Sequence, residues 1–450
     1  MAPAQAPGAL AVCATISLPT ILMLARRSPE RAFLLRLFVV GLLIRLLLGA
    51  VIYVAHFEEF FGGDANTYDM FGVALRAAWH GDSLQAAAYE NFVSSGAGAW
   101  GMLYLVAGVY ELIGRNMLAI QFVNAAVGAA TPAVIYYIAQ HLFNNVRVSR
   151  LAAFLTCFYP SLVLWSSQAL KDGIIVLMLV LAIMATLRLM EKISVRYVVI
   201  LAACLFALLS LRFYIFYMMS AAVAGAFVIG MKSLNAQNLL GRFLAIAVIG
   251  LAFTWFGVLR SANTQFERYG NLEAVQRSRL DAAQSAGSGF GKDVDVHTTE
   301  GALTAIPMGL IYLLFAPFPW QLASLRQSLT LPEMIVWWVS FPLLVLGFWF
   351  AIKHRLKEIS PILLFTTMLT LAYSLFQGNV GTAYRQRSQL LVFYFIFVAV
   401  GAVLLKERSE DQRRQALLAK QELTKRQAAR ALARRTALDR RPGHTALRES

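Results

Sequence analysis

The sequence predicts an all-α, polytopic integral membrane protein, and three observations support this fold class. Of the 450 residues, 59% are hydrophobic and only 14% are charged, whereas a soluble domain is about half apolar and a quarter charged. Apolar runs of about 20 residues, the length of a membrane-spanning helix, recur along the chain. The net charge of +16 is concentrated in basic clusters between these runs, so it indicates membrane topology and no nucleic-acid partner.

The membrane spans are predicted from length and hydropathy. We expect a helical bundle of about 10–13 spans in one domain over residues 1–405. The ten clear runs are residues 33–55, 117–140, 150–168, 172–190, 197–213, 214–231, 242–259, 334–352, 359–376 and 388–405. Three further runs are short, broken by proline or followed by arginines, and their crossing stays open: residues 8–25, 99–114 and 303–320.

Basic clusters orient these spans, because Lys and Arg concentrate in cytoplasmic loops. The clusters are Arg26–Arg31, Asn144–Arg150, Arg188–Arg196, Lys232–Arg242, Lys353–Lys357 and the tail 406–450. The ten spans alternate correctly between these clusters only if 99–114 and 303–320 lie along the outer face or dip into it. The tail holds 13 Lys and Arg against 6 Asp and Glu, which predicts a basic cytoplasmic helix.

This topology gathers the remaining polar segments on the outer face. Residues 56–116 are predicted to form a first outer loop with interfacial helices, and residues 260–332 a larger loop with a re-entrant segment. Residues 56–98 alone contain six acids and one base. No stretch between spans is long enough for a soluble enzyme domain, so the chemistry is expected at the outer membrane surface.

Asp64 is the first candidate for a catalytic residue. It follows Gly62 and Gly63, which let the chain turn sharply as it leaves the membrane. Helical spacing places Asp64 and Tyr68 on one face of an interfacial helix, and Asp69 follows them. A carboxylate at the edge of the bilayer can take a proton from an acceptor hydroxyl. The competing interpretation is a solvated helix N-cap, a position that aspartate favours.

Cationic residues at span ends are candidates for binding a phosphate. Lys171 and Asp172 interrupt a long apolar stretch, and ionisable residues in such places are usually functional or paired. The alternative for Lys171 and Asp172 is a local ion pair at a tight turn. Arg212 is a further candidate for binding a phosphate, and its alternative is an arginine that reaches the membrane surface from an aromatic belt. After a Gly-Thr turn, alternate arginines can bind a phosphate with two hydrogen bonds each. These two arginines and the tyrosine before them are Arg385, Arg387 and Tyr384.

The second outer loop carries weaker signals. Its glycine-rich part, residues 285–291, suits a mobile lid. Asp293, Asp295 and His297 have the spacing of a divalent-metal triad, although an exposed acidic loop is the commoner explanation of such a pattern. Trp320, beside two prolines, suits stacking on a sugar ring or a place in the lipid headgroup region.

Several enzyme classes are excluded by their missing motifs. The sequence has no P-loop, no GxGxxG after a strand, no GxSxG and no HExxH, so nothing indicates ATP, NAD, or a serine or zinc hydrolase. Cys13, Cys157 and Cys204 lie singly inside apolar runs. They are expected to be buried thiols, because neither disulfide nor zinc spacing is present.

Three motifs together resemble the multi-span GT-C glycosyltransferases, which include protein O-mannosyltransferases and the aminoarabinose transferases of lipid A. They are Gly62-Gly63-Asp64-Ala65-x-x-Tyr68, the passage Ile113–Ala119 leading into Gln121–Tyr137, and Phe158-Tyr159-Pro160-Ser161 through Lys171-Asp172. The resemblance covers roughly residues 33–232. The second acid that usually stands beside the loop aspartate is absent, since Ala65 occupies its place, and this argues against protein mannosylation.

The resemblance implies an inverting sugar transfer from a polyprenyl-phosphate-linked donor to a hydroxyl of a glycan, lipid or protein. Asp64 would be the general base, and Lys171, Arg212, Arg385 and Arg387 would stabilise the departing lipid phosphate. The remaining substrate contacts would come from Tyr68, Asp69, Asp172, Trp320 and Tyr384. No nucleotide site is implied and no cofactor is certain, while a divalent cation stays open. The expected location is the bacterial cytoplasmic membrane, with the active site on the periplasmic side.

Two other functions remain open. A polymerase or ligase that joins lipid-diphosphate-linked oligosaccharides for the cell envelope would also use outward arginines and the 260–302 loop. A lipid-linked-sugar transporter or flippase would instead need inverted repeats and discontinuous helices near the middle of the membrane. The sequence shows no convincing repeat, and its charges are expected at the ends of spans.

Overall fold

The chain forms a helical membrane bundle. The structure, a computed structural model, describes residues 2–26, 30–94, 99–229, 271–284, 288–292, 294–322 and 324–439. Within these residues all regular secondary structure is helical, apart from an isolated antiparallel bridge between Gly289 and Asn379. The predicted all-α, polytopic membrane fold is therefore confirmed.

The helices follow one another with short connections. The N-terminal part contains α1 (Ala2–Ala25), α2 (Arg31–Val54), α3 (Glu58–Phe61), α4 (Asp64–Trp79), α5 (Ser83–Ser94) and α6 (Trp100–Ile113). The middle part contains α7 (Met117–Phe143), α8 (Val146–Phe158), α9 (Pro160–Ser166), α10 (Asp172–Glu191), α11 (Val195–Leu211) and α12 (Phe213–Ile229). The C-terminal part contains α15 (Leu272–Gln284), α16 (Thr299–Phe315), the 3-10 turn η1 (Pro319–Gln321), α17 (Leu325–Ser328), α18 (Leu331–Phe376) and α19 (Val380–Asp439).

Six of the described helices are long and apolar enough to cross a membrane, and the bent pair α8–α9 would make a seventh. One of the six begins at Gln5 and ends at Ala25, within the N-terminal run whose crossing the sequence left open. The helices α6, α11, α12 and α16 are apolar but shorter. The predicted span 242–259 and the cluster Lys232–Arg242 lie outside the described residues, so the number of spans stays a prediction.

The helix α7 forms the centre of the first half of the bundle and packs against α1, α2, α8 and α10. It ends at Phe143, and the C-cap residue Asn144 has a φ of +48°, which asparagine tolerates well. The next residue, Asn145, caps α8, because its side chain accepts hydrogen bonds from the backbone N–H groups of Arg147 and Val148. Two asparagines therefore make the tight turn between these antiparallel helices.

The helix α18 changes direction at Arg355, where the backbone leaves helical geometry inside the basic cluster 353–357. Both halves pack against α19. Gly347 in the first half lies against the backbone of α19 near Phe397, and Thr370 in the second half contacts the hydroxyl of Tyr394 at 2.8 Å. The two predicted runs 334–352 and 359–376 are therefore the two arms of one kinked helix.

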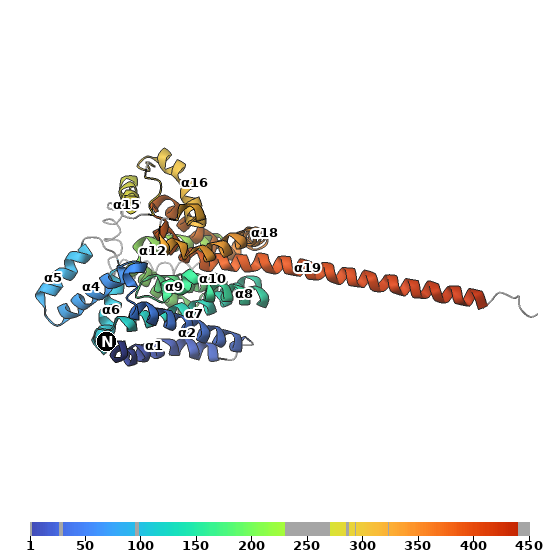
Figure 1. Cartoon of the computed structure of the whole chain (residues 1–450), viewed down its shortest axis with the longest axis horizontal. Coiled ribbons are helices and arrows are strands. Elements are labelled where there is room, and N and C mark those ends of the chain that lie inside the picture. Colours follow the sequence, from blue (N-terminus) through green and yellow to red (C-terminus); the bar gives the residue numbers. More distant parts are fainter. Residues whose placement is uncertain are drawn as a thin grey trace, which may run out of the picture.

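Ion pairs join the basic connections at one end of the bundle. Arg150 of α8 contacts Glu30, just before α2, at 2.7 Å. Arg147 contacts Glu410 of α19 at 2.7 Å. In Figure 1 the long tail of α19 leaves from this end, while α4 and α5 lie at the opposite end. The basic cluster at the α7–α8 turn and the basic tail thus share one end, away from Asp64.

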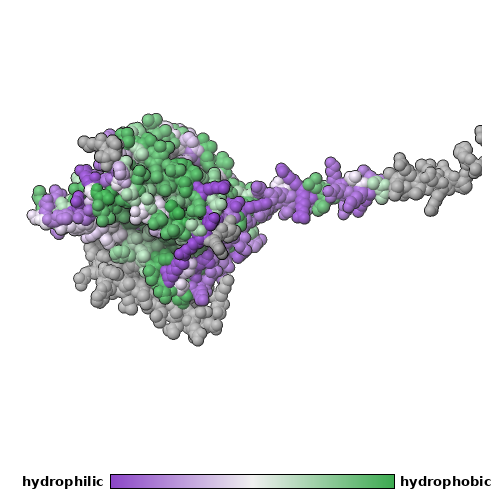
Figure 2. Space-filling view, turned by 90° about the horizontal axis from the view of Figure 1, so that it is seen from below, coloured by the Kyte–Doolittle hydropathy of each residue, from purple (hydrophilic) through white to green (hydrophobic). Residues whose placement is uncertain are grey.

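The last helix continues far beyond the bundle. It runs from Val380 to Asp439 without a break, and its side chains are exposed from Glu410 to Ala429. Figure 2 shows a broad apolar surface over the body of the bundle and a hydrophilic surface along the projecting part of α19. This contrast is what a membrane-embedded body with a tail in water requires.

We expect Gly347→Ala to destabilise the bundle. A Cβ at this position would overlap the carbonyl oxygen of Phe397, so α18 and α19 would have to separate. Overpacking of this kind costs about 1–3 kcal/mol. The measurement is the unfolding midpoint of purified protein in detergent. The control is Gly108→Ala in α6, where a Cβ meets nothing within 4 Å; equal midpoints for both variants would contradict the close approach.

Candidate active site

Asp64 begins the interfacial helix α4. The short helix α3 ends at Gly62, whose φ of +128° is readily adopted only by glycine, and Gly63 then occupies the N-cap position of α4. Asp64 is therefore not the N-cap that one interpretation expected. Its carboxylate is half-exposed and accepts a hydrogen bond from Nη1 of Arg385 at 2.7 Å.

Arg385 connects Asp64 to a second, fully buried carboxylate. Its Nε and Nη2 atoms donate to Oδ2 of Asp172 at 2.8 and 2.6 Å. The guanidinium also lies over the ring of Trp165, 5.6 Å from the centroid. One arginine of α19 thus bridges α4 and α10. These two helices are more than a hundred residues apart in the sequence, and α19 is further along the chain still.

Asp172 has a second cationic partner. Arg212, at the junction of α11 and α12, donates through Nη2 to Oδ1 of Asp172 at 3.3 Å and through Nη1 to the hydroxyl of Tyr214 at 3.2 Å. Each carboxylate oxygen of Asp172 therefore faces one guanidinium. A buried carboxylate needs such compensation, and this one also stands in the first turn of α10, where the helix dipole favours negative charge.

Lys171 lies beside Asp172 and faces α4. Its Nζ is 5.7 Å from the ring centroid of Tyr68. Burial, and next the nearby charge of Arg212, lower the pKa of Lys171 to about 7. Burial likewise raises the pKa of Tyr68, so its hydroxyl keeps its proton at neutral pH. The amine of Lys171 is therefore only partly protonated near neutral pH.

The turn that carries Lys171 is fixed by α7. The side-chain amide of Asn124 donates to the carbonyl of Gln168 at 2.7 Å and also to the carbonyl of Leu170. Both carbonyls belong to the connection between α9 and α10. Sequence analysis did not single out Asn124, because a lone asparagine in an apolar helix carries no spacing signal.

Two candidates lie next to this group without joining it. Arg387 is buried and donates to the carbonyl of Leu314 at 2.8 Å and to the sulfur of Met334 at 3.1 Å. The hydroxyl of Tyr384 donates to the buried carboxylate of Glu333 at 2.7 Å. Residues two apart on a helix point in nearly opposite directions, so Arg385 and Arg387 do not form one anion clamp.

Asp69 faces away from Asp64. It accepts hydrogen bonds from the hydroxyl of Tyr110 at 2.6 Å and from Nε of Arg115 at 3.2 Å. These contacts tie α4 to α6 and to the start of α7. The contacts of Asp69 are therefore structural. The second carboxylate that contacts Arg385, besides Asp64, is Asp172.

The remaining candidates are scattered over the outer loop. Trp320 is 76% exposed and stacks on Phe318 with ring centroids 5.2 Å apart. Asp295 and His297 contact each other at 2.6 Å on the surface, and Asp293 lies outside the described residues. Within the part of the chain that the structure describes, no three His, Cys, Asp or Glu side chains gather as metal ligands.

Two further side chains belong to this region. Trp165 lies under Arg385, and Arg45, in the apolar helix α2, is buried and donates to the hydroxyl of Ser166 at 2.8 Å. In the sequence, Arg45 is one of two arginines inside the predicted span 33–55, the other being Arg36. A charge within a span is costly enough to mark a functional candidate. It also corrects the expectation that all charges lie at span ends.

One family of known proteins is similar to part of the chain. The family model of the dolichyl-phosphate-mannose-protein mannosyltransferases matches residues 99–256. The matched part includes Lys171, Asp172 and Arg212, whereas Asp64 and Arg385 lie outside it. No curated protein matches the chain. That family is one of the GT-C families of lipid-phosphate-sugar-dependent enzymes, in agreement with the resemblance seen in the first half of the sequence. The match covers 158 of the 450 residues, and over that part the chain is similar to this GT-C family of glycosyltransferases.

Proposed function

We propose that the protein transfers a sugar, with inversion, from a polyprenyl-phosphate-linked donor to a hydroxyl acceptor at the outer face of the cytoplasmic membrane. The observation that carries this proposal is the bridge that Arg385 makes between half-exposed Asp64 and buried Asp172. In this proposal, Asp64 is a base that can reach an acceptor, and Arg385 beside it is a cation that can hold a phosphate. These are the two groups that the transfer requires.

In the proposed reaction, Asp64 takes the proton of the acceptor hydroxyl as its oxygen attacks the anomeric carbon of the sugar. The bond between that carbon and the phosphate oxygen breaks, and the electron pair leaves with the lipid phosphate. The departing phosphate gains negative charge, which Arg385 and Lys171 stabilise. A phosphate leaving group needs this charge stabilisation more than it needs a proton.

The donor set of Arg385 suits a switch of partners. Two of its nitrogens stay on Asp172, which is fully buried and held from the other side by Arg212. The third, Nη1, donates to Asp64. A donor phosphate that accepts from Nη1 would release Asp64 to act as the base. Asp172 is thus a positioning residue that orients the guanidinium.

The outer-face location rests on the separation of charges along the bundle. The α7–α8 turn, with Arg147 and Arg150, and the basic tail lie at one end, and Asp64 belongs to α4 at the other. The positive-inside rule assigns the first end to the cytoplasm. The tail would then be cytoplasmic and the catalytic group periplasmic.

One structural observation favours a lipid-linked-sugar flippase as the second candidate. The pair α8–α9 bends by 54° at Pro160, so the predicted span 150–168 is a discontinuous helix. Broken helices often line substrate paths in transporters. A flippase would move the lipid without breaking the sugar–phosphate bond, and would therefore tolerate loss of Asp64 in a transport assay.

We predict that Asp64→Asn and Asp64→Ala lose transfer but still bind the donor. Removal of a general base typically lowers kcat by about 10²–10⁴-fold, while the phosphate contacts of Arg385 and Lys171 remain. The measurement is release of polyprenyl phosphate together with donor binding by the same samples. Glu59→Gln, a neutralised exposed acid in α3, is the matched control. Full transfer activity in both Asp64 variants would rule out this residue as the base.

Donor affinity should fall as the pH rises from about 6 to about 9. The pKa of Lys171 is about 7 in the free site, and a bound phosphate raises it. Lys171 is already protonated below pH 7, so its contribution is complete there. Above that pH, Lys171 has to take up a proton when the donor binds. The donor affinity therefore decreases by at most about tenfold per pH unit.

The measurement is titration calorimetry at several pH values. A phosphodiester donor does not itself titrate in this range, so the slope belongs to the protein. Lys171→Arg should bind with little pH dependence, and Lys171→Met should bind weakly at every pH. A wild-type affinity that is independent of pH would remove Lys171 from the phosphate site.

Single-cysteine labelling should place the ends of the bundle on opposite sides of the membrane. The three native cysteines are buried, so their background reaction is low. Leu84→Cys in α5 is expected to react with an impermeant maleimide from the periplasm, and Leu417→Cys only after the cells are lysed. Both original side chains are well exposed, at 75% and 61%. Labelling of both positions from one side would overturn the proposed topology.

A further inference from the structure

Arg45 is a buried cation inside a membrane span. It lies within α2, between Arg31 and Val54, and is only 1% exposed. Its Nε donates to Ser166 at 2.8 Å, and its Nη1 donates to the carbonyls of Gly41 and Cys157 at 3.0 and 3.1 Å. All three acceptors are neutral oxygens. A charge kept in this environment needs a reason beyond packing.

The first reason is the break between α8 and α9. The helix α8 ends at Phe158, and α9 begins at Pro160 at an angle of 54°. Proline has no N–H and cannot continue the hydrogen-bond ladder, so the last carbonyls of α8 lose donors. The guanidinium of Arg45 supplies one to Cys157, and its charge suits the negative end of the helix dipole. Arg45 therefore stabilises the break from the α8 side.

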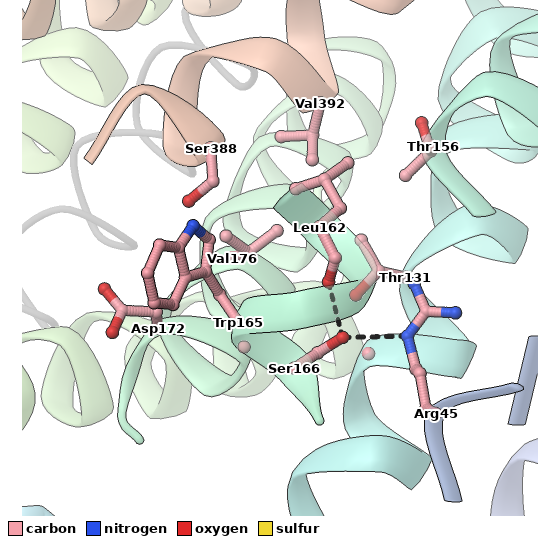
Figure 3. Close-up of a pocket in the computed structure, with 12 residues that line it drawn as sticks. Arg45, Thr131, Thr156, Leu162, Trp165, Ser166, Asp172, Val176, Ser388 and Val392 are labelled. Atoms are coloured by element: carbon pink, nitrogen blue, oxygen red, sulfur yellow. Dashed lines mark hydrogen bonds between the residues drawn. The ribbon is translucent and has the colours of Figure 1, made fainter. Parts of the chain in front are cut away.

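The second contact reaches the other side of the break. Ser166 is the last residue of α9, and its hydroxyl receives the Nε–H of Arg45 (Figure 3). Ser166 packs closely on Gly128 and on Gly173, where an added Cβ would lie 3.2 Å from the Cβ of Ser166. Gly173 directly follows Asp172. One side chain of α2 thus holds both α8 and the end of α9, which leads into the Lys171–Asp172 turn.

The space between Arg45 and the site is not filled by side chains. A cavity of about 20 Å³ is lined by Arg45, Thr131, Thr156, Trp165, Ser166 and Asp172, among others. Figure 3 shows Trp165 between Asp172 on one side and Ser166 with Arg45 on the other. The volume is that of about one water molecule. Tight packing therefore does not set the position of Asp172 from this direction, and polar contacts have to do so.

We propose that Arg45 is a positioning residue of the donor-phosphate site. Its contacts to Cys157 and Ser166 fix the bend of α8–α9 and so hold Trp165, Lys171 and Asp172 where they meet Arg385. This inference rests on the proposed function, because the site that Arg45 positions is the phosphate site described above. It predicts that loss of the contact weakens donor binding, although Arg45 itself touches no substrate.

The test removes, one at a time, the hydroxyl groups of two residues that line the same cavity, Ser166 and Thr156. Ser166→Ala removes an acceptor of Arg45, whereas Thr156→Val removes a hydroxyl that donates to Ala152 within its own helix. We expect Ser166→Ala to raise the donor Kd and KM at least threefold with a nearly unchanged acceptor KM. Thr156→Val should leave both as in wild type. A purely structural role would lower the unfolding midpoint without changing the donor KM of the folded fraction.

Variants of Arg45 extend the comparison. Arg45→Gln is expected to raise the donor KM more than tenfold, and Arg45→Lys, which keeps the charge, should recover part of the loss. The control is Arg36→Gln, an exposed arginine of the same helix. If Arg45→Gln does not fold, the Ser166 and Thr156 pair decides the question.

The outcomes separate the two proposals. A wild-type protein that binds no polyprenyl-phosphate sugar would refute the proposed function, and the role of Arg45 with it. A wild-type protein that binds the donor normally, with an unchanged donor Kd in Ser166→Ala and in folded Arg45→Gln, would refute the role of Arg45 alone.

Discussion

The buried carboxylate of Asp172 is the constraint on which the site depends. A fully desolvated negative charge is tolerated only with close positive partners, and here the partners come from distant segments. Arg212 approaches from the α11–α12 junction and Arg385 from α19, and Arg385 then reaches Asp64 on α4. Removal of one partner from a buried pair typically costs about 3–5 kcal/mol. The same charge balance thus joins the starts of α4, α10 and α19 to the α11–α12 junction.

This arrangement explains how the site can lack the usual neighbouring acid at Ala65. The second carboxylate comes from the start of α10, and a single arginine couples it to Asp64. The family match covers residues 99–256 and therefore contains Asp172 and Arg212 but neither Asp64 nor Arg385. The proposed chemistry needs all four residues, so under this proposal the base and its bridging cation lie outside the matched part.

Much of this could be read from the sequence, because membrane helices and their charges follow simple rules. The sequence predicts the helical membrane class and marks as candidates Asp64, Lys171, Asp172, Arg212 and Arg385, while the number of spans stays a prediction. Asp69 and Arg387 were grouped with them by sequence proximity, but helix geometry turns them toward Tyr110 and Leu314. The bend at Pro160 and the role of Arg45 depend on contacts more than a hundred residues apart, for which hydropathy gives no signal.

The uninterrupted course of α19 has a mechanical consequence. Arg385 stands near the start of the helix and Asp439 near its end, so about 80 Å of continuous helix separates them at 1.5 Å per residue. The guanidinium of Arg385 and the charged, exposed tail therefore belong to one continuous helix. A force that rotated or shifted the projecting end would move Arg385 relative to Asp64 and Asp172. Movement of the exposed tail would in this way be transmitted to the bridge between Asp64 and Asp172.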